Sequence, residues 1–95
     1  MKKFVYLFAD VAEPSGDVHA QWEAWFTAVG PNLVDSGNPF GSGRKLTAAG
    51  SRELTAAHDP AAGYTIVAAE SLDDAEALLA GCPAHRVRIY EALPM

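Results

Sequence analysis

The segment that most constrains the fold is the short run FVYLFA at residues 4–9. Its aromatic and β-branched residues predict a β-strand. Because side chains alternate along a strand, Phe4, Tyr6 and Phe8 share one face, whereas Val5 and Leu7 share the other. A strand that is apolar on both faces is covered from two sides, so the fold has to supply two covering layers.

Two segments predict helices. In the first, Asp17 is a candidate N-cap, apolar residues recur at helical spacing over residues 18–29, and Gly30-Pro31 ends the helix. In the second, Ser71 is the candidate N-cap and Gly81 marks the end. The apolar positions of the second helix are Leu72, Ala75, Leu78 and Leu79.

Further strands are predicted at residues 33–35, 64–69 and 87–92. Residues 45–48 and 53–57 predict a hairpin, which competes with residues 33–35 for the second place in the sheet. The resulting order matches the β-α-β-β-α-β ferredoxin-like unit, an α+β fold with an antiparallel sheet. Both helices are expected on the same face of that sheet.

Two helices cover only one face, although the first strand and residues 64–69 are apolar on both. The open face then holds more apolar surface than a monomer exposes. We therefore predict a homodimer whose two sheets face each other.

Size and charge exclude several classes of protein. With 95 residues the chain predicts a single domain spanning residues 1–95. Its net charge of -5 argues against nucleic-acid and anionic-membrane partners. One cysteine forms no internal disulfide, Asp10 interrupts the only signal-like apolar run, and no stretch approaches the length of a membrane span. These features predict a cytoplasmic protein.

His19 is the first candidate for chemistry, because it borders the apolar stripe of the first predicted helix. It is either an ordinary helix histidine or a general acid–base whose ring is oriented by a carboxylate. Asp35 ends the strand that follows this helix and is the candidate carboxylate; the alternative is a turn aspartate before Ser36-Gly37. Trp22 and Trp25 are either core residues or the wall of an apolar pocket.

The remaining titratable residues predict no catalysis. His58 lies in a loop, and Cys82 with His85 supplies only two of the four ligands of a structural zinc site, so no metal site is predicted. Cys82 is interpreted as a small buried hydrophobic residue; the alternative is a thiolate nucleophile, for which His85 and Arg86 are the nearby cationic side chains. The glycine-rich residues 41–45 lack the full spacing of a phosphate-binding loop.

Three stretches resemble the YCII-related family, in its DGPF-like branch. They are HxxWxxWF at residues 19–26, DSGNPFG at residues 35–41, and GYTIVAAESLD continuing to GCP at residues 63–83. The resemblance covers nearly the whole chain and implies a ferredoxin-like fold that dimerises as an α+β barrel. It also implies a His-Asp dyad, matching His19 and Asp35. One relative is a dehydrochlorinase acting on a chlorinated hydroquinone, and some members are encoded beside extracytoplasmic-function sigma factors.

Two functional hypotheses follow. The chain is either an enzyme without cofactor that acts on a small molecule, for instance an aromatic one, or a non-catalytic ligand-binding or regulatory protein-interaction module. In the enzyme, His19 is the acid–base group and Asp35 orients it. Tyr6, Trp22 and Asn38 are predicted to line its pocket.

Overall fold

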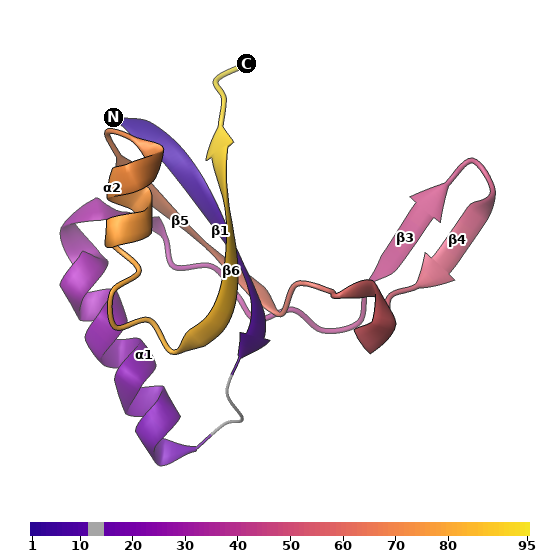
Figure 1. The fold of residues 1–95 in the computed structure, drawn as a ribbon, viewed down its shortest axis with the longest axis horizontal. Coiled ribbons are helices and arrows are strands. Elements are labelled where there is room, and N and C mark those ends of the chain that lie inside the picture. The colour runs from indigo at the N-terminus through magenta and orange to yellow at the C-terminus, as the bar shows by residue number, and fades with distance from the viewer. Residues whose placement is uncertain (12–14) are drawn as a thin grey trace.

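The structure, a computed structural model, describes residues 1–11 and 15–95 (Figure 1). Four strands form one antiparallel sheet in the order β2-β5-β1-β6. These strands are β1 (Lys2–Val11), β2 (Leu33–Asp35), β5 (Gly63–Ala69) and β6 (Ala84–Ala92). The helices α1 (Gly16–Val29) and α2 (Leu72–Ala77) lie together on one side of this sheet (Figure 1). The expected α+β class and the expected placement of both helices on one face are confirmed.

The hairpin does not join this sheet. Strands β3 (Arg44–Thr47) and β4 (Gly50–Glu53) form a separate two-stranded sheet that projects from the body (Figure 1). The sequence left residues 33–35 and the hairpin as competing candidates for the second strand of the sheet. Residues 33–35 form that strand, β2. The physical reason is the exposed, polar composition of both hairpin strands, which offers no apolar face to the core.

The first helix begins and ends differently from its predicted caps. Ser15 is the N-cap, since its hydroxyl accepts a hydrogen bond from the Val18 N–H, and Asp17 lies in the first turn. Gly30 keeps a right-handed backbone with φ −43°, so it is not the left-handed C′ glycine that the sequence suggested. The chain instead continues from Gly30 to Asn32 as a short 3-10 helix before entering β2.

The second helix has the predicted N-cap, because the Ser71 hydroxyl accepts from the Asp74 N–H at 3.1 Å. Its regular part ends at Ala77, earlier than Gly81. Ala75 is buried and Leu78 packs against the core, whereas Leu72 is largely exposed. The apolar stripe is therefore shorter than the sequence indicates.

The core lies between the sheet and the helices. One face of β1 supplies its buried aromatic residues Phe4, Tyr6 and Phe8, and α1 supplies Trp25 and Val29. The Trp25 indole packs edge-on against Phe8 and its Nε1 donates to the Leu78 carbonyl at 2.8 Å. This hydrogen bond joins α1 to the chain that follows α2, so the aromatic core also fixes the second helix.

The opposite face of the sheet is half-buried and mostly apolar. Val5 lies between its cross-strand partners Ile66 and Tyr90, so the three side chains form one row across β5, β1 and β6. Tyr90 is 54% exposed. No helix covers this face among the described residues, as Figure 1 shows.

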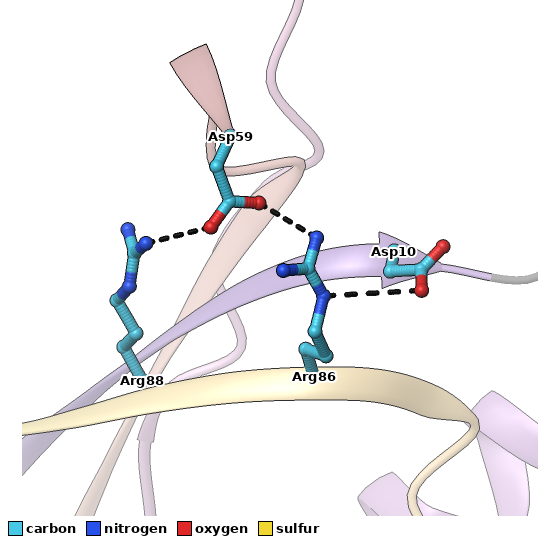
Figure 2. Close-up of polar contacts among 4 residues, drawn as sticks. All are labelled: Asp10, Asp59, Arg86 and Arg88. Atoms are coloured by element: carbon cyan, nitrogen blue, oxygen red, sulfur yellow. Dashed lines mark hydrogen bonds and ion pairs between the residues drawn. The ribbon is translucent and has the colours of Figure 1, made fainter. Parts of the chain in front are cut away.

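Charged residues occupy one end of this open face. Arg86 and Arg88 are two residues apart on β6 and therefore point to the same side, where each guanidinium binds one oxygen of Asp59, at 2.6 and 2.7 Å (Figure 2). Asp10 lies 3.8 Å from Arg86. Asp59 has a left-handed backbone with φ 49°. The bidentate bridge ties the connector between β4 and β5 to the edge strand β6.

The buried Tyr6 hydroxyl predicts a pH dependence of stability. It donates to the Ala75 carbonyl oxygen, and burial, with the nearby Cys82 thiol as a lesser cause, raises the pKa of Tyr6 from 10.0 to about 12. Between these values the unfolded chain releases the proton and the folded chain keeps it, so stability falls as pH rises. We expect the free energy of unfolding to fall by about 1.4 kcal/mol per pH unit between the two pKa values, 10.0 and about 12.

The measurement is urea unfolding of the wild type and of Tyr6→Phe at pH 8 and pH 11. At pH 8 the variant is expected to be less stable by about 1 kcal/mol, since the Ala75 carbonyl loses its partner. At pH 11 the difference in unfolding free energy between the wild type and the variant should shrink or reverse. Equal losses in both proteins between the two pH values would contradict the assignment.

Candidate functional site

A pocket with a volume of about 610 Å³ lies between α1, the loop after β2 and the start of β5. Its walls are mainly aromatic and apolar, supplied by Phe8, Trp22, Phe26, Pro39 and Tyr64. Polar residues also line the pocket, namely His19, Glu23, Ser36, Asn38 and Thr65. An apolar pocket with a few polar groups is the usual form of a small-molecule site.

The α1 wall follows from helical spacing. Residues 22 and 23 follow residue 19 by three and four positions, and residue 26 follows residues 22 and 23 by four and three, so their side chains project from one side of the helix. Trp22 packs edge-on against Phe8 with ring centroids 5.2 Å apart, and it stacks on Phe26 at 5.8 Å. Because Phe8 belongs to the buried core, the pocket wall is continuous with the core.

The opposite wall is a loop held against β5. Thr65 Oγ1 donates to the Ser36 carbonyl at 2.9 Å, and the Tyr64 N–H donates to the Asn38 carbonyl at 3.3 Å. Gly37 has φ 76°, and a Cβ there would lie 1.7 Å from the Tyr64 carbonyl oxygen. The loop can approach β5 this closely only because residue 37 is glycine.

His19 has a carboxylate partner on its own helix. Its Nε2 lies 2.9 Å from Oε1 of Glu23, and the two side chains are 77% and 70% exposed. With Nε2–H donating to this carboxylate, Nδ1 carries the free lone pair of the neutral ring. Both residues of this pair are among those that line the pocket.

Asp35 does not meet His19. Its Oδ1 accepts from the Gly37 N–H at 2.8 Å and its Oδ2 accepts from the Tyr64 hydroxyl at 3.2 Å. The predicted orientation of His19 by Asp35 is thus replaced by the contact with Glu23. Asp35 is a turn aspartate that positions the loop and Tyr64, which is the alternative that the sequence left open.

Of the three residues predicted to line the pocket, Trp22 and Asn38 do so and Tyr6 does not. Tyr6 is fully buried, with its hydroxyl bound to the Ala75 carbonyl beneath α2. A strand that is apolar on both faces does not reveal which aromatic residue borders the pocket. Phe8, two residues further along the same face, takes the predicted place of Tyr6.

Glu23 and Tyr64 were missed by the sequence analysis. The signal for Glu23 was present, because a glutamate four residues after a histidine on a helix lies within contact distance. Tyr64 gave no comparable signal, since its contact with Asp35 joins residues 29 positions apart.

The other titratable candidates stay outside the site. Burial raises the pKa of the Cys82 thiol, despite a hydrogen bond with the Ala84 backbone, which disfavours a reactive thiolate. The His58 ring accepts a hydrogen bond from the Thr55 N–H at 3.1 Å and caps a short 3-10 helix. No group of three or more metal-ligating side chains occurs within residues 1–11 and 15–95. In the same part of the chain no helix has the length and apolar character to cross a membrane.

No family model, no curated protein and no solved structure matches the chain. The resemblance to the YCII-related family accordingly stays a proposal.

Proposed function

We propose that the chain is a small enzyme that binds an aromatic molecule in the pocket beside α1 and uses His19 as its acid–base group. The observation that carries this proposal is the aromatic pocket of about 610 Å³ with the His19–Glu23 pair in its lining. Such a volume accommodates a single substituted ring. The resemblance to the YCII-related family supports the same substrate class.

The chemistry follows from the two ring nitrogens. In chlorohydroquinone, Nδ1 of His19 takes the proton of one ring hydroxyl and delivers it to the carbon that bears chlorine, while Glu23 accepts the Nε2–H. Loss of the second hydroxyl proton then expels chloride, so chlorohydroquinone yields benzoquinone and HCl without an oxidant. The aromatic side chains of Trp22 and Phe26 hold the ring of the substrate, and Asn38 supplies a polar contact. No cofactor takes part in this proposal.

The test uses hydroquinone as a binding probe and chlorohydroquinone as a substrate. His19→Gln is expected to lower chloride release by about 10²- to 10⁴-fold while hydroquinone still shifts the amide signals of residues 36–38 and 63–65 in NMR spectra. His58→Gln is the matched control, because His58 lies outside the pocket and should leave turnover unchanged. Unchanged turnover in His19→Gln would overturn the catalytic role.

A second candidate is a ligand-binding module without turnover. The mainly apolar lining of the pocket favours it, since binding needs no acid–base group. In that case hydroquinone binds with the same affinity to the wild type and to His19→Gln, and neither releases chloride from chlorohydroquinone. If Phe26→Ala then fails to bind hydroquinone, the binding site is the pocket beside α1.

We also infer that the fold is ferredoxin-like and that two copies pair through their open sheet faces as an α+β barrel. The strand order β2-β5-β1-β6, with the hairpin as an insertion, supports the first part. The apolar row of Val5, Ile66 and Tyr90 on the uncovered face supports the second. Pairing would remove this row from water.

A charge on the open face is expected to separate the two copies. Tyr90→Asp places a carboxylate beside Val5 and should raise the dimer dissociation constant by about 30-fold or more, because a central aromatic residue of an interface often contributes at least 2 kcal/mol. Analytical ultracentrifugation measures the constant. Leu72→Asp, on the exposed side of α2, is the control and should leave it unchanged.

A further inference from the structure

The hairpin arm, defined as β3 and β4 (Arg44–Thr47 and Gly50–Glu53), has no core of its own. Every residue of both strands is exposed, and Leu46 is 80% exposed. Figure 1 shows the arm on the side of the sheet opposite to α1 and α2. A protein chain that covers the open sheet face would therefore lie next to the arm.

The molecule is more extended than a compact chain of its mass. Its radius of gyration is 14.5 Å, whereas about 12 Å is expected for a compact domain of this length. Its accessible surface is 6670 Å², against roughly 5,300 Å² for a compact monomer of 10.1 kDa. This excess of accessible surface is larger than the area that each partner buries in a stable protein–protein interface, which is about 800 Å².

The charge of the arm is opposite to that of the rest of the chain. It carries three of the seven basic residues and one of the twelve acidic residues, so its net charge is +2 and that of the remainder is −7. Lys45 and Arg52 face each other directly across the two strands. Like charges in this position repel, and among the described residues neither has an acidic partner within 4.0 Å.

The base of the arm is anchored to the sheet. The Leu54 N–H donates to the Gly43 carbonyl at 2.9 Å and closes the two strands at their base. A few residues later Asp59 binds Arg86 and Arg88 of β6 (Figure 2). The arm therefore leaves the body from a fixed connector at the edge of the open face.

We propose that the hairpin arm is a docking arm for a second copy of this chain, and that its Lys45–Arg52 side packs against the acidic body of the copy seated on the open sheet face. The inference rests on the proposed homodimer and adds a contact to it. In a two-fold dimer each arm reaches the other copy, so the contact forms twice. The acidic partner relieves the repulsion between Lys45 and Arg52 and covers part of the excess surface.

The test is Arg52→Glu, compared with the wild type by analytical ultracentrifugation at low and high salt. This substitution places opposite charges across the arm and so favours the hairpin itself, while it removes the positive charge that meets the partner. We expect the dimer dissociation constant to rise about tenfold at low salt, and the difference from wild type to shrink at high salt. Lys2→Glu makes the same change of charge on β1 and should shift the constant less than threefold.

The outcomes separate the two proposals. A wild-type dimer with the same dissociation constant in Arg52→Glu overturns the docking arm and leaves the sheet-face dimer standing. Equal weakening by Arg52→Glu and Lys2→Glu also overturns it, because net charge alone then explains the effect. A wild type that is monomeric at every concentration overturns both the arm and the dimer.

Discussion

Gly37→Ala is expected to destabilise the protein by about 3 kcal/mol or more and to abolish binding in the pocket. A Cβ at this position would lie 1.7 Å from the Tyr64 carbonyl oxygen and 2.6 Å from its carbonyl carbon, and both are backbone atoms that cannot rotate away. The φ of 76° adds strain for any L side chain. The loop therefore has to move away from β5, which breaks the hydrogen bond from Thr65 to Ser36.

Gly41→Ala is the matched control in the same loop. A Cβ at Gly41 meets no atom within 4 Å and its φ is outside the left-handed range, so its stability should stay within about 0.5 kcal/mol of wild type. Urea unfolding gives both free energies, and an NMR titration with hydroquinone reports the pocket. If Gly37→Ala unfolds at the same urea concentration as Gly41→Ala, the close approach of the loop to β5 is wrong.

Trp25→Ala is expected to cost about 3 to 5 kcal/mol of folding free energy, as removal of a buried tryptophan usually does. The side chain is 2% exposed, and its ring contacts Tyr6, Phe8 and Phe26 with centroids 5.2 to 6.1 Å apart. Its loss also leaves the Leu78 carbonyl without the indole donor. A domain of this length has a total stability of about 5 to 14 kcal/mol, so the variant approaches the limit of folding.

Trp22→Ala, one helical turn away, separates stability from function. Trp22 is half-buried and lines the pocket, so its removal should cost less folding free energy than that of Trp25 and should abolish hydroquinone binding. Thermal unfolding followed by circular dichroism measures the first effect, and a shift of several degrees per kcal/mol makes the two variants easy to distinguish. Equal melting temperatures for the two variants would contradict the division between core and pocket.

The elements themselves were predictable because their signals are local. The two-sided apolar pattern of residues 4–9 identified the central strand β1, and Ser71 before two aspartates identified the start of α2. The pocket was predictable in part: spacing along α1 put His19 beside Trp22. Asp35 is near His19 only if the chain after α1 returns along the helix, whereas Glu23 lies one turn away on the same helix and makes the contact.

The amino-acid sequence by itself determined which segments form strands and helices and which face of each is apolar, because these depend on neighbours a few positions apart. Only the tertiary structure decided that Asp35 binds Tyr64 and that the hairpin leaves the sheet. The same holds for Asp59, which bridges two arginines on a distant strand. Each of these contacts joins segments far apart in the chain, so it depends on strand register and loop path, which no local pattern encodes.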